Sequence, residues 1–225
     1  TILETGFGIG VNFLATWDAW RRDAARPRRL HYVAIEKHPF LRDDLALLLA
    51  GYPDFVALAR ELVDRWPAPL PGTHRRALEG GGISLTVVFD DVESALRRLD
   101  ARADAIYLDG FAPSRNPEMW SAPVLRAVAR RAQPGATCAT WSTARAVRDG
   151  LADAGFAVEL RPGFGHKREM LVGRHERVAE RQLAARQACD VVEGEVVGDQ
   201  RAEQDERGDQ DRREGRVERV RGRVE

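Results

Sequence analysis

Four apolar runs of the sequence end in acidic residues or glycines. These ends are ETGFGIG at 4–10, Glu36 after HYVAI, Asp90-Asp91 after LTVVF, and DGFAP at 109–113 after AIYL. Carboxylates accept hydrogen bonds from hydroxyl and amino groups, and glycines let the backbone approach a ligand closely. If the four runs are parallel strands, their carboxyl ends meet at one edge of the sheet, where open α/β sheets bind their ligands.

The glycines of the first segment have the spacing G-x-G-x-G, and Glu4 precedes them. A dinucleotide-binding loop, G-x-G-x-x-G, would place its third glycine at position 11, which is Val11. The shorter spacing favours S-adenosylmethionine, which carries a cationic sulfonium and has no pyrophosphate. A tight strand-to-helix turn without a ligand remains an open reading of this segment alone.

The other acids have two readings each. Glu36, 26 residues beyond Gly10, can accept from two ribose hydroxyls or be a solvated acid at a strand end. Asp91 can accept from an adenine amino group and also cap the following helix. Asp109 can orient an acceptor amine and take its proton, or hold the methionine end of the cofactor.

Strands and helices alternate over residues 1–175. The pattern predicts strands at 1–4, 30–35, 83–89, 104–108, 136–140, 156–160 and 169–172. It predicts helices at 11–22, 39–50, 54–65, 92–99, 118–131 and 143–154. Short connections between them imply a doubly wound α/β fold with a mostly parallel, seven-stranded sheet. The last two strands have no helix between them and should form an antiparallel hairpin, as in the Rossmann-like sheet of class I methyltransferases.

The composition of the 225 residues sets further limits. The 35 basic and 35 acidic residues balance, so bulk charge favours neither nucleic acid nor membrane. Residues 176–225 are highly charged and contain no aromatic side chain, which predicts a disordered tail after the 1–175 domain. The apolar runs are too short to span a bilayer, and the two cysteines, Cys138 and Cys189, indicate a reducing, cytoplasmic compartment. The histidines and cysteines have no metal-ligand spacing, so no metal is expected.

Three long motifs resemble one family. LETGFGIGVNFL (3–14), LDGFAPSRNPEMW (108–120) and GFGHKREML (163–171) are similar to the methyltransferase domain of the bifunctional tRNA wobble-uridine enzymes of the MnmC family. The resemblance covers about residues 1–175. It implies methyl transfer from S-adenosylmethionine to the amine of 5-aminomethyl-2-thiouridine at wobble position 34 of tRNA, which gives 5-methylaminomethyl-2-thiouridine.

The resemblance also implies roles for particular residues. Asp109 would be catalytic, as the group that orients and deprotonates the amine. The cofactor would be held by Glu4, Gly6, Phe7, Gly8, Gly10, Asn12, Glu36, Lys37, Asp91 and Asp109. The anticodon loop would be held by Phe111, Arg115, Asn116, Phe164, Lys167 and Arg168, with the aromatic rings stacking on the splayed base. Ordinary core or rim packing is the alternative for both rings.

The chain departs from the family's pattern in three respects. It begins inside the first predicted strand, and after 175 it lacks the flavin-dependent oxidoreductase domain of the bifunctional relatives. We therefore expect no FAD on this chain and, as a partner, a separate or truncated FAD-dependent oxidoreductase domain. Asp90 stands where the family has glycine, which adds a negative charge beside the presumed adenine contact. The alternatives are a methyltransferase for small molecules, a nicotinamide-dependent oxidoreductase and an inactive truncated remnant.

Overall fold

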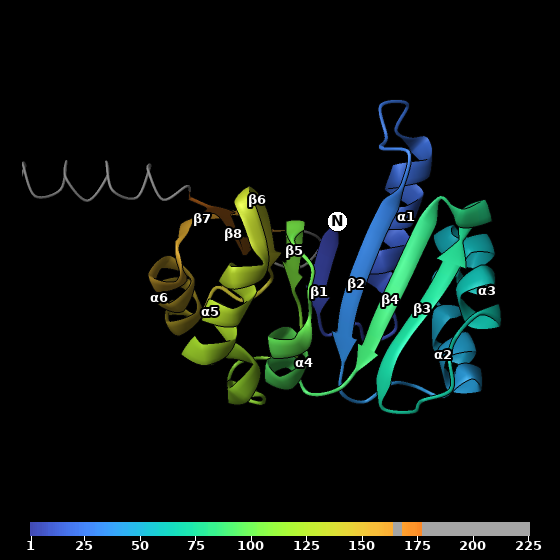
Figure 1. Ribbon diagram of the computed structural model, residues 1–225, viewed down its shortest axis with the longest axis horizontal. Coiled ribbons are helices and arrows are strands. Elements are labelled where there is room, and N and C mark those ends of the chain that lie inside the picture. Colours follow the sequence, from blue (N-terminus) through green and yellow to red (C-terminus); the bar gives the residue numbers. More distant parts are fainter. Residues whose placement is uncertain (164–167, 177–225) are drawn as a thin grey trace, which may run out of the picture. The chain divides into compact units, whose positions relative to one another are not determined.

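An eight-stranded sheet runs through the computed structural model, which describes residues 1–163 and 168–176 (Figure 1). In chain order the strands are β1 (Ile2–Thr5), β2 (Leu30–Glu36), β3 (Gly72–Leu78), β4 (Ile83–Phe89), β5 (Ala103–Leu108), β6 (Ala132–Thr140), β7 (Phe156–Pro162) and β8 (Glu169–His175). Their order in space is β3-β4-β2-β1-β5-β6-β8-β7. Strands β4, β2, β1, β5 and β6 are mutually parallel, whereas β3 pairs antiparallel with β4, and β8 pairs antiparallel with both β6 and β7.

Three helices cover each face of this sheet (Figure 1). The helices α1 (Val11–Arg22), α2 (Arg42–Leu49) and α3 (Val56–Asp64) pack on one face, and α4 (Val92–Arg98), α5 (Ala122–Arg131) and α6 (Arg145–Ala154) on the other. Short 3₁₀ turns lie at Pro53–Phe55, Glu79–Gly81 and Pro117–Trp120. Because side chains alternate along β2, Tyr32 joins the core under α1 while Val33 joins the core under α4 and α5.

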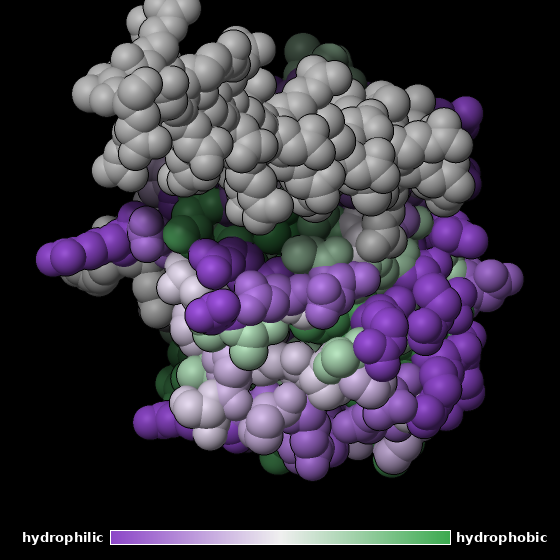
Figure 2. All heavy atoms as spheres, turned by 90° about the vertical axis from the view of Figure 1, so that its left-hand side faces the viewer, coloured by the Kyte–Doolittle hydropathy of each residue, from purple (hydrophilic) through white to green (hydrophobic). Residues whose placement is uncertain are grey.

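The helix α6 has one apolar face that packs on the sheet and one charged face that is exposed to solvent. Its buried residues are Val147 and Leu151, spaced four apart on one helical face. Asp149 lies on the outer side, within ion-pair distance of Arg145 and Arg148. Where residues are described, the face of the molecule in Figure 2 is largely hydrophilic, with smaller apolar areas between the hydrophilic ones.

The predicted fold class is confirmed, with one strand more than expected. The additional strand is β3, whose sequence GTHRRAL has no apolar run and alternates exposed with half-buried positions. It forms because it hydrogen-bonds the open edge of β4, with Gly72 opposite Phe89 and Leu78 opposite Ile83. Tertiary pairing thus overrides a weak local preference for the extended state.

The helix expected over 118–131 is two elements. A 3₁₀ turn ends at Trp120, Ser121 is extended with φ −67° and ψ 151°, and α5 begins at Ala122. Pro123 lies in the first turn of α5, the place where a missing backbone N–H removes no helical hydrogen bond. The break lets the segment before α5 reach the carboxyl edge of the sheet.

The register of the parallel strands aligns their ends. Thr5 lies opposite both Ile35 and Leu108, and Glu36 lies opposite Phe89. The residues that follow these strands therefore meet at one edge, as the sequence pattern predicted.

Residues 164–167 and 177–225 lie outside the described part of the chain. The predicted charged tail falls almost entirely on them, so its boundary after 175 stays a prediction. Within the described residues, no helix has the length and apolar character needed to cross a membrane.

Candidate active site

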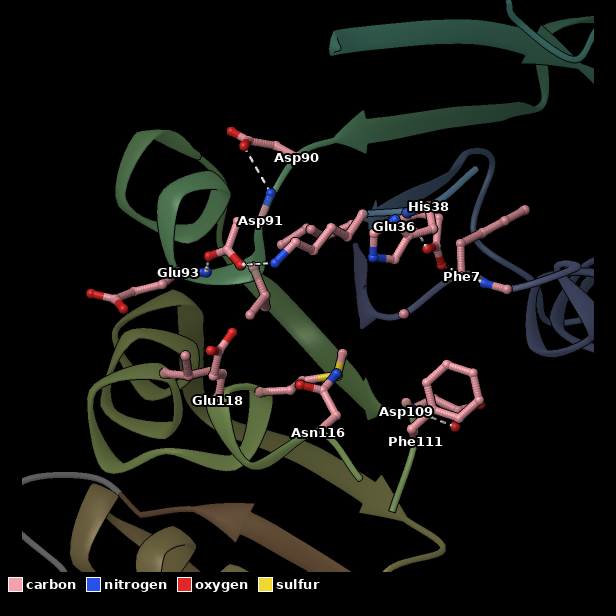
Figure 3. A pocket seen from close by; sticks show the side chains of 18 of the residues that line it. Phe7, Glu36, His38, Asp90, Asp91, Glu93, Asp109, Phe111, Asn116 and Glu118 are labelled. Carbon is pink, nitrogen blue, oxygen red and sulfur yellow. Dashed lines mark hydrogen bonds and ion pairs between the residues drawn. The ribbon is translucent and has the colours of Figure 1, made fainter. Parts of the chain in front are cut away.

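A cavity of about 760 Å³ opens at the carboxyl edge of the sheet (Figure 3). It lies between the β1–α1 loop, the ends of β2, β4 and β5, and the segment that precedes α5. Its volume is within the range of about 300–1,000 Å³ typical of small-molecule sites. The predicted site residues that line it are Gly6, Phe7, Gly8, Asn12, Glu36, Lys37, Asp91, Asp109, Phe111, Arg115 and Asn116. Glu4, Gly10 and Arg168 are not among its lining residues.

The β1–α1 loop depends on two glycines that pack against neighbours. Gly6 has φ +98°, and a Cβ there would lie 2.6 Å from the backbone oxygen of Asp109. Gly10 has φ +80°, and a Cβ there would lie 2.6 Å from the ring of Phe7. That ring is buried and stacks on Trp66 at 5.3 Å between centroids, so Phe7 presents little of its side chain to a ligand.

Gly8 is different, because a Cβ there would meet no atom within 4 Å. Its backbone lines the cavity, and its N–H donates to Glu36 Oε2 at 2.9 Å. The other oxygen of Glu36 accepts from the His38 N–H at 2.8 Å. Each oxygen thus retains further acceptor capacity for a ligand.

Asp91 has one of the two roles that the sequence suggested, the helix cap, while its contact with adenine stays a prediction. Its Oδ1 accepts from the Glu93 N–H at 3.0 Å and so caps α4. Its Oδ2 lies 3.3 Å from Lys37 Nζ at the wall of the cavity. Asp91 and Lys37 thereby join the ends of β4 and β2.

The neighbouring Asp90 forms an ion pair with Arg98 of α4. The Asp91 N–H, followed by Arg98, holds the pKa of the Asp90 carboxyl below its usual range. The additional negative charge expected beside the cofactor site is therefore partly neutralised by a guanidinium group.

Asp109 is held by three donors. Its Oδ1 accepts from the Gly110 N–H at 2.7 Å and from the Trp141 indole at 3.1 Å, while its Oδ2 accepts from Asn12 Nδ2 at 2.8 Å. A carboxylate has about four acceptor positions. Within residues 1–163 and 168–176, the remaining one is on Oδ2, since Oδ1 already has two partners.

Glu4 lies beneath this site, and its side chain is fully buried. Its Oε1 accepts from Asn12 Nδ2 at 2.7 Å, and its Oε2 accepts from the Tyr32 hydroxyl at 3.0 Å. Burial, which disfavours the charged form, raises the pKa of Glu4 to about 8. Burial, with Glu4 nearby, also raises the pKa of Tyr32 well above its usual value.

The mouth of the cavity is formed by the segment between β5 and α5. The side chain of Phe111 is 70% exposed, and its backbone oxygen accepts from the Trp120 indole at 2.9 Å. Arg115 and Asn116 line the same rim. Arg168 is exposed to solvent and does not line the cavity. Phe164 and Lys167 lie outside the described residues.

Sequence reasoning missed Trp141 and Met119. Trp141 follows β6, which is parallel to β5, so its indole reaches the carboxylate that follows β5. The aromatic residue directly after a strand in ATWS was the available signal. Met119 lines the cavity and packs so closely on Gly110 that a Cβ there would lie 2.3 Å from its sulfur.

The cavity is acidic, which suits a cationic ligand. Its acidic lining residues are Glu36, Asp90, Asp91, Glu93, Asp109 and Glu118, against the basic Lys37 and Arg115. Over residues 1–163 and 168–176, no group of three histidine, cysteine or acidic side chains is arranged to hold a metal ion.

An open α/β sheet with a glycine loop and carboxylates around a cavity at its strand ends defines a Rossmann-like, ligand-binding enzyme domain. Residues 53–176 match the family described as S-adenosyl-L-methionine-dependent methyltransferase, and the chain belongs to that family.

Curated relatives confirm the resemblance carried by the motifs. The chain is 56% identical over 174 residues to the tRNA 5-methylaminomethyl-2-thiouridine biosynthesis bifunctional protein MnmC of an Azoarcus species, covering 77% of this chain and 27% of the relative. It is 52% identical over 206 residues to the protein of that name in Aromatoleum aromaticum, covering 90% of this chain and 32% of the relative. The chain thus spans about a third or less of these relatives' length.

A solved structure supports the same placement. The crystal structure of MnmC2 from Aquifex aeolicus superimposes with a TM-score of 0.61 at 25% identity, covering 76% of this chain and 52% of that one.

Proposed function

We propose that this domain transfers the methyl group of S-adenosylmethionine to the amine of 5-aminomethyl-2-thiouridine at wobble position 34 of tRNA. The observation that carries the proposal is the Asp109 carboxylate, which three donors hold at the cavity with one acceptor position left on Oδ2. The similarity to MnmC proteins supports tRNA as the acceptor.

The residues present fit the cofactor. S-adenosylmethionine supplies an electrophilic methyl group on a positively charged sulfur. The acidic lining favours that cation, and Gly8 leaves room for a close approach. Glu36 has acceptor capacity for ribose hydroxyls, and Asp91 for an adenine amino group.

Asp109 acts as the general base that removes a proton from the acceptor amine. An alkylamine is mostly protonated at neutral pH, and the ammonium form has no lone pair with which to attack. Oδ2 would accept the proton, directly or through one water, and leave the amine nitrogen with a free lone pair. Bound S-adenosylmethionine would supply the methyl group to that nitrogen, with its sulfonium leaving as a neutral thioether. Alignment of the two reactants is the domain's main contribution and can supply about 7–11 kcal/mol in favourable cases.

The mouth of the cavity suits a single base taken out of a loop. RNA loops present unstacked bases that aromatic side chains can stack on. Phe111, exposed at the rim, would stack on the wobble base, and Arg115 and Asn116 would contact uracil oxygens or phosphate. An enzyme with this substrate works in the cytoplasm.

The acceptor amine must come from another reaction. The names of the relatives describe bifunctional proteins, and the chain spans about a third or less of their length. We assign the preceding step to an FAD-dependent oxidoreductase domain outside residues 1–176.

The test is methyl transfer from labelled S-adenosylmethionine to tRNA carrying 5-aminomethyl-2-thiouridine, with tRNA lacking the aminomethyl group as the control. We expect label only in the modified tRNA. Binding of S-adenosylhomocysteine without transfer to either tRNA would contradict the proposed acceptor and favour a small molecule or an inactive remnant.

A further inference from the structure

At the wall of the cavity, Asn12 connects two carboxyl groups. Its Nδ2 lies 2.7 Å from Glu4 Oε1 and 2.8 Å from Asp109 Oδ2. An amide NH₂ has two hydrogens, so both are committed. The position of the amide, and with it the hold on Asp109 Oδ2, depends on how strongly Glu4 attracts it.

Glu4 cannot take part by touching a ligand, because it is fully buried and does not line the cavity. We propose that Glu4 is a positioning residue that acts as a neutral carboxylic acid: it fixes Asn12 so that the amide orients Asp109 for proton acceptance. The proposal rests on the role given to Asp109 in the proposed function.

The surroundings of Glu4 favour the neutral acid. The groups around it are Asn12 from α1, Tyr32 and Glu36 from β2, Asp109 after β5, and Tyr107, which lies opposite Glu4 on the neighbouring strand β5. None of them is a cation. Burial, with smaller contributions from the charges of Asp109 and Glu36, raises the pKa of Glu4 to about 8.

Protonation leaves the contacts of Glu4 intact. A protonated Glu4 can donate from Oε2 to the Tyr32 hydroxyl across the 3.0 Å contact, and its Oε1 remains a neutral acceptor for Asn12. A carboxylate is a stronger acceptor than a neutral carboxyl group. Ionised Glu4 would therefore draw the amide of Asn12 away from Asp109.

Glu4→Gln is the discriminating variant, because it stays neutral at every pH. Its carbonyl oxygen can accept from Asn12, and its NH₂ can donate to the Tyr32 hydroxyl. The chain carrying this substitution therefore preserves both contacts and lacks only the ionisation.

The first readout is the single-turnover rate of methyl transfer to the modified tRNA between pH 6.5 and 9.5, for wild type and Glu4→Gln. With a pKa of about 8, the neutral fraction of Glu4 falls from about nine-tenths at pH 7 to about one-tenth at pH 9. We expect the ratio of the wild-type rate to the variant rate to fall several-fold over this interval, and at most about ten-fold. A ratio independent of pH would overturn the proposal, since a merely structural role lowers the rate equally at every pH.

The second readout does not require the proposed substrate. The Trp141 indole N–H donates to Asp109 Oδ1, so its NMR resonance in the ¹⁵N-labelled full chain reports how that carboxylate is held. Trp141→Phe identifies the resonance. We expect it to shift with an inflection near pH 8 in wild type and not in Glu4→Gln.

The two readouts separate the two hypotheses. An inflection present in wild type and lost in Glu4→Gln, with no methylation of any tRNA, would support the positioning role and contradict the proposed function. The same titration in both proteins, or in neither, would exclude Glu4 as the residue that orients Asp109.

Discussion

The two oxygens of Asp109 have different surroundings, and this difference decides which of them would accept the proton in the proposed function. Oδ1 accepts from the Gly110 N–H and the Trp141 indole, whereas Oδ2 accepts from Asn12 alone among the residues that the structure describes. A third donor on Oδ1 would compete with two good hydrogen bonds. In the proposed function the acceptor amine would therefore meet Oδ2, while the two donors on Oδ1 fix the plane of the carboxylate.

The substitution Asp109→Asn tests this division. The amide that it introduces retains an oxygen for the two donors on the Oδ1 side, but it presents an NH₂ group where the proton should go. We expect the rate of methyl transfer to fall by about 10²–10⁴-fold, the usual contribution of a general base. We expect S-adenosylhomocysteine affinity, measured by calorimetry, to change only a few-fold.

Asp149→Asn is the matched control, because Asp149 is exposed on α6 and does not line the cavity. It should leave both quantities unchanged. A rate for Asp109→Asn equal to that of the control would remove Asp109 from the reaction.

The residues of this site differ in how visible they are in the sequence. Glu36 ends β2, Asp109 directly follows β5, and Asp91 is the second residue after β4, so the pattern alone places them at the carboxyl edge. Trp141 was missed because its contact depends on β6 lying beside β5. The sequence pattern placed Glu4 among the cofactor contacts. It could not show that Asn12 lies between Glu4 and the cavity, because that arrangement depends on how α1 packs on β1.

At the scale of elements, the β1–α1 loop is packed directly on the end of β5. The Cβ of an alanine at position 6 would lie 2.6 Å from the Asp109 backbone oxygen and 3.2 Å from Met119 Cε. Gly6 of this loop therefore leaves no room for a side chain beside the backbone of Asp109, the proposed proton acceptor. A change at Gly6 must therefore move Asp109.

We expect Gly6→Ala to lower the free energy of unfolding by about 2–4 kcal/mol, from strain at positive φ together with the clash. Gly81→Ala is the matched control, because Gly81 has φ +93°, close to the +98° of Gly6, and a Cβ there would meet nothing within 4 Å. The control should show the strain alone, about 1–2 kcal/mol. Urea unfolding measures the free energy of unfolding of both variants. Equal decreases would mean that the backbone around Asp109 can shift to accommodate the added Cβ at little cost.

Element boundaries show where sequence patterns stop being informative. The buried strands β2 and β4 were predicted within a residue because β-branched and aromatic side chains fill them. The edge strand β3 was not predicted, because His74, Arg75 and Arg76 have no apolar periodicity. Its extended form comes from the partner it pairs with and not from its own composition.

At the scale of the whole molecule, packing of the helices on both faces of the sheet buries the carboxyl group of Glu4 away from solvent. Among the described residues, Glu4 is the only buried residue with a carboxylic acid or basic side chain. The other buried polar residues are Thr5, Thr140 and Ser142. Its contacts to Asn12 and Tyr32 satisfy its oxygens without supplying a positive charge. The fold therefore stabilises the protonated acid relative to the carboxylate.

This preference makes the stability of the domain depend on pH. Glu4 has a pKa of about 8 in the fold and about 4.5 when it is exposed to water, so between these values the folded chain holds a proton that the unfolded chain has lost. Stability then decreases as the pH rises. The contribution of Glu4 is fully present below about pH 4.5, falls steadily above it, and levels off once the pH passes about 8.

Glu4→Gln removes this dependence, because it carries no titrating proton in either state. We expect urea unfolding to give similar stabilities for wild type and variant near pH 4.5, and an advantage of the variant that grows to a few kcal/mol, at most about 5, by pH 8. Glu159→Gln, at an exposed carboxylate paired with Arg161 on β7, is the control and should follow the wild-type curve. Parallel curves for wild type and Glu4→Gln would show that Glu4 is ionised in the folded protein, in contradiction to both its burial and its proposed role.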